Sequence, residues 1–220
     1  MKIKAVVFDL DGTLVDTAPD FIVVLNRLLA EEGRPPLPDQ RIRDTVSNGA
    51  RALISLGFEL DEDDPEFERL RLRLLELYSD HLAVFSKTFA GIDELLSILS
   101  EHQLQWGIAT NKPETYTTPL LQGLGLNPAC VICPDHVAER KPHPESLHLA
   151  AQQMGIDVKN IIYVGDHLRD IECGRRAGSI TIAACYGYID AGDDPVLWQA
   201  THSVNNAADI WPIVEKYLSV

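Results

Sequence analysis

Two aspartates, Asp9 and Asp11, stand one residue apart in the segment FDLDGT at residues 8–13. An apolar run precedes them, and side chains two apart on a strand share a face, so we expect the two carboxylates to be neighbours. Such a pair can supply a nucleophile and a general acid from one short segment. Because Asp-Gly is also a common turn signal, the pair alone does not decide between chemistry and a turn.

A second acidic motif, GDHLRD at residues 165–170, ends another apolar run. Ligands of parallel α/β sheets bind at the carboxyl ends of the strands, so Asp166 should face the same edge as Asp9. Mg²⁺ prefers carboxylates, waters and phosphate oxygens, and Asp9 and Asp166 could be two of its ligands. Asp170 lies one helical turn further and would support these ligands. Each carboxylate by itself could cap a helix, but two strand ends that converge on one edge favour the metal site.

Hydroxyl and positive groups complete the set. Thr110 and Asn111 end the run at residues 105–110 and offer a hydroxyl and backbone N–H donors to a phosphoryl oxygen. Lys141 precedes a helical pattern and could reach the same edge as a point charge, although a solvated surface position is the usual fate of a lysine. Because phosphoryl transfer depends on positioning and on neutralising charge, this set predicts phosphoryl chemistry.

Five short apolar runs are typical of buried parallel strands, since each is continuous and flanked by turn residues. They lie at residues 4–10, 105–110, 129–133, 160–165 and 179–184. Helical spacing separates the later runs, with Leu95 and Leu99 before the second and Leu147 and Met154 before the fourth. Alternating strands and helices predict an α/β fold with a Rossmann-like, doubly wound parallel sheet.

Residues 16–85 interrupt this alternation with helical spacing and no convincing strand. Apolar residues recur at helical intervals at residues 21, 24, 25, 28 and 29, and again at residues 67, 70, 74, 77 and 78. The acidic segment at residues 61–65 is interpreted as a solvated helix N-terminus rather than a metal site. We therefore expect an inserted α-helical domain at residues 16–85 and a core formed by residues 1–15 and 86–220.

The composition limits the partners of the chain. Its 220 residues are 45% hydrophobic and 24% charged, which is ordinary for a soluble globular protein. The net charge of −14 argues against non-specific binding to nucleic acid or to an anionic membrane, while a metal ion could still hold an anionic substrate. No apolar run approaches the ~20 residues of a membrane helix, and the first apolar stretch is too short for a secretory signal. We expect a cytoplasmic monomer or homodimer that binds a small phosphorylated substrate.

The four cysteines do not have the spacing of a disulfide framework. Cys130 and Cys133 match a C-x-x-C pair, which could be a redox or zinc pair. A zinc site would need a second pair of ligands nearby, and none has the spacing. We therefore expect Cys130 and Cys133 to be small core residues of a buried strand.

Taken in order, these motifs resemble those of the haloacid dehalogenase superfamily, and the resemblance covers the whole chain. The motifs are DLDGT at residues 9–13, Thr110, Lys141-Pro142 and GDHLRD at residues 165–170. The helical insertion is similar to the cap of phosphoglycolate phosphatases. The resemblance implies a Mg²⁺-dependent phosphatase that acts on phosphoric monoesters.

The resemblance also implies a role for each residue of the site. Asp9 would attack phosphorus to form an aspartyl-phosphate, and Asp11 would protonate the leaving alcohol and then activate water. Thr110 and Lys141 would hold the phosphoryl group. Mg²⁺ would be bound by Asp9, the backbone carbonyl of Asp11 and Asp166. Supporting roles would fall to Asp170, to Gly12 in permitting the turn and to Thr13 in orienting the loop.

The presence of Asp11 favours a phosphatase over a dehalogenase and over a non-catalytic module. Relatives that release halide lack an acid at this position, and a non-catalytic phospho-receiver or binding module needs none, so both are disfavoured. Phosphonate hydrolysis in this superfamily uses a lysine of the cap, and residues 16–85 contain no lysine. A phosphosugar mutase of the same superfamily stays open, because it shares all four motifs.

Two segments narrow the range of candidate substrates. Residues 131–137 and 186–189 resemble a branch of phosphoglycolate phosphatase-like enzymes that includes the N-acetylmuramic acid 6-phosphate phosphatase of bacterial cell-wall recycling. Both candidate substrates carry a carboxylate, which Arg51 could bind from a segment similar to a substrate-facing loop of the cap. Arg51 could equally be a solvated helix residue. His167, next to Asp166, could touch water of the metal site or only cap the following helix.

Overall fold

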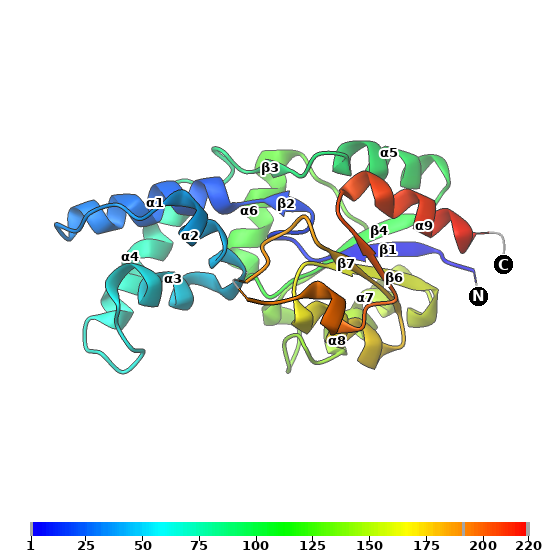
Figure 1. The fold of residues 1–220 in the computed structure, drawn as a ribbon. Coiled ribbons are helices and arrows are strands. Elements are labelled where there is room, and N and C mark those ends of the chain that lie inside the picture. Colours follow the sequence, from blue (N-terminus) through cyan, green and yellow to red (C-terminus); the bar gives the residue numbers. More distant parts are fainter. Residues whose placement is uncertain (1, 191, 219–220) are drawn as a thin grey trace.

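Residues 2–190 and 192–218 are described by the computed structural model, and within these ranges six strands form one parallel sheet (Figure 1). In spatial order the strands are β5 (Val131–Ile132), β4 (Gln105–Ala109), β1 (Ala5–Phe8), β6 (Ile161–Gly165), β7 (Ile180–Ala184) and β8 (His202–Val204). Each neighbouring pair is parallel. The predicted doubly wound sheet is confirmed, since β1 is central and the chain adds strands on both sides of it.

The five apolar runs of the sequence correspond to β1, β4, β5, β6 and β7, and each strand is shorter than its run. The sixth strand, β8, was not predicted. Its residues His202, Ser203 and Val204 form no apolar run, and only Val204 is buried. This strand lies at the edge of the sheet and is defined by its pairing with β7 rather than by its own pattern.

Helices cover both faces of the sheet, because its central strands are apolar on both sides. Along β1, Val6 and Phe8 share a core with α5 (Ile92–Glu101), α6 (Glu114–Leu124) and α9 (Ile210–Lys216). Ala5 and Val7 point the other way and share a core with α7 (Glu145–Met154) and α8 (Leu168–Ala177). Figure 1 shows α5 and α9 on one side of the sheet, and α7 and α8 on the other.

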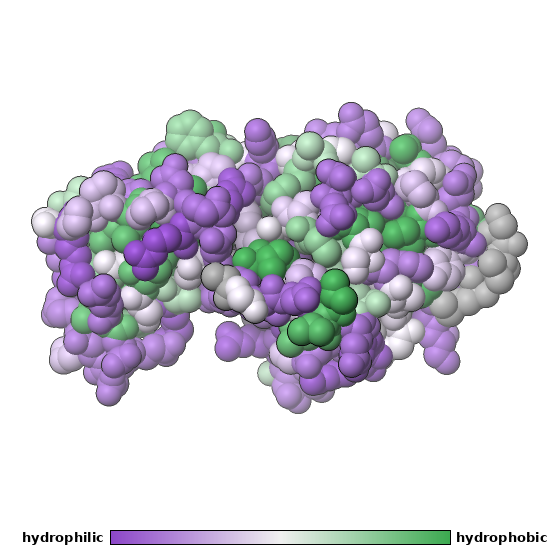
Figure 2. All heavy atoms as spheres, in the orientation of Figure 1, coloured by the Kyte–Doolittle hydropathy of each residue, from purple (hydrophilic) through white to green (hydrophobic). Residues whose placement is uncertain are grey.

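Between β1 and β4 the chain inserts four helices that have an apolar core of their own. They are α1 (Ala18–Glu31), α2 (Asp39–Arg43), α3 (Gly49–Phe58) and α4 (Phe67–Ser79). The apolar positions that helical spacing marked in α1 and α4 are all buried. Helices α1 to α4 and the loops that join them (the inserted segment) form a lobe in Figure 2, separated from the sheet region by a notch at the lower edge. The chain passes between the two through β2 (Val15–Asp16) and β3 (Lys87–Thr88), which pair antiparallel.

Cys130 and Cys133 are core residues, as expected. Cys130 and Cys133 flank β5 and are buried, and all four cysteines of the chain are free thiols. Burial raises the pKa of Cys130 and Cys133 to about 11, which disfavours the reactive thiolate.

A buried carboxylate fastens the inserted segment where it returns to the sheet. Asp20, in the first turn of α1, has no solvent exposure. It accepts hydrogen bonds from the backbone N–H groups of Phe85 (2.8 Å) and Ser86 (3.0 Å) and from the Ser86 hydroxyl (2.5 Å). The chain at residues 85 and 86, where it returns to the sheet, is thereby held against the first turn of α1.

We expect Asp20→Ala to lower the free energy of unfolding by roughly 1–3 kcal/mol or more, because the donors of residues 85 and 86 lose a buried acceptor. Asp80→Ala, at an exposed position after α4, should change it by less than about 0.5 kcal/mol. Urea unfolding of the two variants measures the difference. Equal stability of the two would contradict the fastening role of Asp20.

Candidate active site

The carboxyl ends of β1 and β4 open into a cavity of about 580 Å³. One wall comes from the sheet and the opposite wall from the inserted segment. The sheet side contributes Asp9, Asp11, Thr110, Asn111, Lys112, Lys141 and Arg169, and the inserted segment contributes Phe21, residues 46–52, Arg71 and Tyr78 among others. Most of the residues that the sequence singled out therefore meet in one place.

Asp9 is buried just beyond the end of β1 and has a cation of its own. Its Oδ1 accepts the N–H of Leu10 at 2.7 Å and lies 2.9 Å from Nζ of Lys141. Burial would raise the pKa of Asp9, but the charge of Lys141, helped by that of Arg169, holds it below its ordinary value. The carboxylate is therefore ionised, as a nucleophile must be.

Lys141 has no exposed side-chain surface, which rules out the solvated position. Its Nζ lies 2.7 Å from Oδ1 of Asp170 and 2.9 Å from both the Ala109 carbonyl and the Tyr163 hydroxyl. Burial would lower the pKa of Lys141, but Asp170 and Asp9 raise it, so the side chain is charged. The ammonium thus joins groups from the ends of β1 and β4 to β6 and α8.

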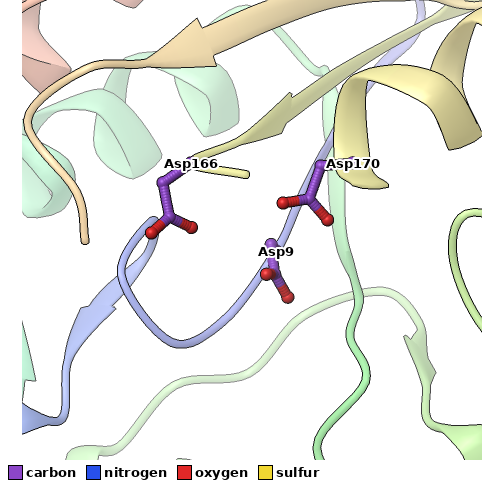
Figure 3. Close-up of side chains that lie close together, drawn as sticks. All are labelled: Asp9, Asp166 and Asp170. Atoms are coloured by element: carbon purple, nitrogen blue, oxygen red, sulfur yellow. The ribbon is translucent and has the colours of Figure 1, made fainter. Parts of the chain in front are cut away.

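Three carboxylates converge beside this ammonium, those of Asp9, Asp166 and Asp170. One oxygen from each lies within 4.8 Å of the others, and Figure 3 shows the three side chains close together. Burial, together with the charges of Asp9 and Asp170, raises the pKa of Asp166 to about 8. Excess negative charge and oxygen-only ligands suit a hard divalent cation, which makes this group a candidate metal site. Asp170, expected only in support, offers an oxygen of its own, and the carbonyl of Asp11 as a ligand stays a prediction.

The turn after β1 is shaped around Asp166. Thr13 donates from Oγ1 to Oδ1 of Asp166 at 2.8 Å, and the backbone N–H of Tyr188 donates to Oδ2 at 2.9 Å. Gly12 has a φ of 84°, and a Cβ on it would lie 2.1 Å from Oδ2 of Asp166. A side chain at this position would displace Asp166, so the turn requires glycine.

Asp11 has a different partner, Lys112, which was not among the predicted site residues. Because β1 ends at Phe8, alternation along a strand is not what brings Asp11 to the cavity that Asp9 also lines. Nζ of Lys112 lies 3.1 and 3.3 Å from the two carboxylate oxygens of Asp11, and Thr17 donates from Oγ1 to Oδ1 at 2.5 Å. The two carboxylates of the motif are therefore held by separate lysines.

Lys112 also reaches the inserted segment. Its ammonium donates to the Tyr78 hydroxyl at 2.9 Å and lies 4.6 and 5.1 Å from the ring centres of Tyr78 and Phe21, which stack on each other. Burial would lower the pKa of Lys112, but Asp11 and Tyr78 raise it, so the ammonium stays charged over the two ring faces. The sequence could have indicated Lys112 as a site residue, because it directly follows Thr110 and Asn111 at the strand end. Its aromatic partners could not be predicted, because they are distant in the chain.

Thr110 and Asn111 follow β4 as predicted, with different surroundings. Thr110 is buried at the cavity wall, and its Oγ1 accepts the N–H of Lys112 at 3.2 Å. Asn111 bonds through both ends of its amide to the backbone of Lys141, at 3.1 and 3.2 Å. Asn111 therefore positions Lys141, and its direct contact with a substrate stays a prediction.

Arg51 and His167, whose roles the sequence left open, have clear neighbours. Arg51 lines the cavity, but its side chain is 53% exposed and its Nη1 pairs with Oε2 of Glu62 at 2.7 Å. Glu62 belongs to the acidic segment that precedes α4. Nδ1 of His167 accepts the N–H of Arg169 at 3.2 Å, so the interpretation of His167 as a helix cap is confirmed.

A short turn of the inserted segment, containing Ser47 and Asn48, touches the sheet side of the site. Ser47 donates from Oγ to Oδ2 of Asp166 at 3.3 Å, and its carbonyl accepts Nη2 of Arg169 at 2.5 Å. Asn48 donates from Nδ2 to Oδ1 of Asp190 at 2.8 Å. The inserted segment is therefore closed against the acidic residues, through contacts that no sequence pattern indicated.

Known proteins match this chain along nearly its whole length. A family described as haloacid dehalogenase-like hydrolase matches residues 6–184. A Pseudomonas aeruginosa protein named N-acetylmuramic acid 6-phosphate phosphatase is 46% identical over 220 residues, which cover 99% of this chain and 97% of the relative. A Xanthomonas campestris pv. campestris protein named phosphoglycolate phosphatase is 39% identical over 210 residues, 94% of this chain and 95% of the relative. The crystal structure of a predicted phosphoglycolate phosphatase from Haemophilus somnus has a TM-score of 0.85 at 26% identity and covers 97% of this chain and 98% of its own.

We expect Lys112→Met to lower the turnover of an aryl phosphate by roughly 10–100-fold, because Asp11 loses the cation that orients it. The variant should also unfold more easily than the wild type, since a buried pair would be broken. Lys159→Met, at an exposed position, is the matched control. Steady-state kinetics and melting curves measure both effects, and a variant as active as the control would contradict the role of Lys112.

The raised pKa of Asp166 predicts how the metal-free protein responds to pH. A carboxyl whose pKa is about 8 in the fold, against an ordinary value of 3.8, holds its proton more tightly when folded. This stabilising contribution is complete below pH ~4 and is lost as the pH rises towards 8. In EDTA we therefore expect the melting temperature to fall from about pH 6 to about pH 8, and to fall less in Asp166→Asn. Identical pH slopes for the two proteins would contradict the assignment.

Proposed function

Because the chain belongs to the haloacid dehalogenase-like hydrolase family and is a phosphoric monoester hydrolase, we propose that it hydrolyses N-acetylmuramic acid 6-phosphate through an aspartyl-phosphate on Asp9. The observation that carries the proposal is Asp9 itself, an ionised carboxylate at the wall of the cavity. Its Oδ1 is engaged by Leu10 and Lys141. In the described part of the chain no hydrogen bond reaches Oδ2, so this oxygen would attack phosphorus.

The reaction takes two steps on Asp9. In the first, Oδ2 of Asp9 forms a bond to phosphorus as the ester bond breaks, and Asp11, which has to be protonated before this step, gives its proton to the leaving alcohol. In the second, ionised Asp11 takes a proton from a water that attacks phosphorus, and the acyl-phosphate bond breaks to release inorganic phosphate. Thr17 and Lys112 fix the orientation of the Asp11 carboxylate for both transfers.

Other residues stabilise the phosphoryl group during both steps. Thr110 would donate from its hydroxyl, and Lys141 would contribute its charge from beside Asp9. Asn111 keeps the backbone of Lys141 in place. The inserted segment would act as a cap that excludes water from the reacting atoms.

We propose Mg²⁺ as the cation of the three-carboxylate site. The donor set consists of hard carboxylate oxygens, and the raised pKa of Asp166 reflects negative charge that a divalent cation would neutralise. Asp9 and Asp166 would hold the ion together with the backbone carbonyl of Asp11, and Asp170 would support them. When bound, Mg²⁺ would offset the negative charge of the nucleophile and the phosphoryl oxygens.

Two observations favour N-acetylmuramic acid 6-phosphate over phosphoglycolate. The relative named for the former is 46% identical, against 39% for the one named for the latter. The cavity of about 580 Å³ also falls within the roughly 300–1,000 Å³ typical of sites for drug-sized ligands, and a two-carbon acid would fill little of it. The carboxylate of the sugar is remote from its phosphate, which suits an arginine on the opposite wall such as Arg51.

The cellular setting follows from the proposed substrate. N-acetylmuramic acid 6-phosphate would make the protein an enzyme of cell-wall recycling, and we propose a cytoplasmic monomer or homodimer. None of the helices in the described ranges has both the length and the apolar character to cross a membrane.

Asp9→Asn should reduce phosphate release from an aryl phosphate by at least roughly 10³-fold, because the nucleophile is lost while the fold keeps an isosteric side chain. Asp93→Asn, an exposed change in α5, should leave activity unchanged. EDTA should suppress the wild type and excess Mg²⁺ should restore it. Near-native turnover by Asp9→Asn would rule out the nucleophile.

A substrate panel tests the proposed sugar. We expect kcat/KM for N-acetylmuramic acid 6-phosphate to exceed that for phosphoglycolate and for hexose phosphates by at least about tenfold. A preference for phosphoglycolate would overturn the substrate and keep the phosphatase. Isomerisation of a hexose phosphate with little phosphate release would identify a phosphosugar mutase instead.

A further inference from the structure

The two lysines of the site have no N–H left for a phosphoryl oxygen. An ammonium group has three N–H bonds. Within 2.9 Å of Nζ of Lys141 lie oxygens of Asp9, Asp170, Ala109 and Tyr163. Nζ of Lys112 is likewise taken by both carboxylate oxygens of Asp11 and by the Tyr78 hydroxyl. These lysines act on a phosphoryl group through their charge, and a cationic hydrogen-bond donor has to come from elsewhere in the cavity.

Arg169 lines the cavity and has an unused donor. It lies in the first turn of α8 and lines the same cavity as Asp9. Nη2 donates to the carbonyl of Ser47 at 2.5 Å. Nε is buried, and no acceptor for its N–H lies among residues 2–190 and 192–218. A buried donor without a partner costs free energy, which a ligand oxygen would recover.

The other arginines of the cavity wall are less suited to this role. Arg51 and Arg71 come from the inserted segment, and each is paired with a glutamate of that segment, at 2.7 and 2.6 Å. Arg140 is exposed at the rim. A buried, unfilled donor and a place on the cavity wall shared with Asp9 coincide at Arg169.

We propose that Arg169 binds the phosphoryl group of the substrate, with its Nε–H donating to a non-bridging oxygen. The proposal rests on the phosphatase function proposed above. A guanidinium presents several N–H groups in a fixed plane that matches the oxygens of a phosphate, and its bonds to charged oxygens are the strong ones. Negative charge on the three equatorial oxygens in the transition state is what this contact stabilises.

Ser47 positions this guanidinium from the inserted segment. Its carbonyl holds Nη2 of Arg169, while its hydroxyl donates to Oδ2 of Asp166 at 3.3 Å. The arginine is therefore fixed at the phosphoryl position when the inserted segment is closed. Phosphate binding and closure favour each other, because each stabilises the same arrangement of Arg169.

The test compares Arg169→Gln and Arg169→Lys with Arg175→Gln, which removes an exposed arginine of the same helix that is bound to Gln199. Calorimetric titration of inorganic phosphate with Mg²⁺ present gives Kd without turnover, and kinetics with an aryl phosphate give KM and kcat. We expect Arg169→Gln to raise Kd and KM by roughly 10–100-fold, the loss of one charge-assisted hydrogen bond. Arg169→Lys should recover part of the loss, and Arg175→Gln should match the wild type.

The proposal is overturned if Arg169→Gln and Arg175→Gln bind phosphate with the same Kd. Arg169 would then only hold the carbonyl of Ser47. Melting curves establish that the variants fold. If Arg169→Gln does not fold, Arg169→Lys decides, since it keeps the charge but lacks Nε–H, and a wild-type Kd there overturns the proposal. Failure of the phosphatase function would look different, because the wild type itself would release no phosphate from any ester.

Discussion

The buried ammonium of Lys141, between the carboxylates of Asp9 and Asp170, is the interaction on which the site depends. It lies 2.9 Å from the first and 2.7 Å from the second, without solvent contact. Taking a charge out of water costs on the order of several kcal/mol. Lys141 lowers the pKa of Asp9, and Asp170 and Asp9 raise the pKa of Lys141, so Asp9 and Lys141 are both charged. The same ammonium contacts the Ala109 carbonyl at the end of β4 and the Tyr163 hydroxyl on β6. The charge of Asp9 and the spacing of the strand ends therefore depend on one side chain.

A second lysine allows two carboxylates to coexist in one short turn. Asp11 is paired with Lys112 and not with Lys141, so the two acidic groups of the motif do not compete for one cation. The two pairs also differ in what they join. Lys141 connects parts of the sheet, whereas Lys112 connects the sheet to α1 and α4 through Phe21 and Tyr78. The inserted segment therefore contacts the partner of Asp11 directly, while the partner of Asp9 contacts the sheet and α8.

The sheet and the helical insertion could be predicted because each depends on a local pattern. Apolar runs end at polar residues such as Thr110, and the buried positions of α1 and α4 recur at helical intervals. The partners of the charged groups could not be predicted in the same way. The contacts of Lys112 with Tyr78 and of Arg169 with Ser47 join segments far apart in the chain, and only the packed fold brings them together. β8 is a similar case, since it exists as a strand only because β7 offers it an edge.

The pairing of β2 with β3 has a consequence for how such an enzyme can diversify. The inserted segment leaves the sheet and returns to it at neighbouring points, Val15–Asp16 and Lys87–Thr88. A stretch of chain whose ends meet can be lengthened, shortened or exchanged without moving the strands on either side. Recombination within a gene could therefore replace the cavity wall that the inserted segment contributes while Asp9 and the three-carboxylate site are inherited unchanged. That wall and the three-carboxylate site are encoded in separate stretches of the gene and can evolve at different rates.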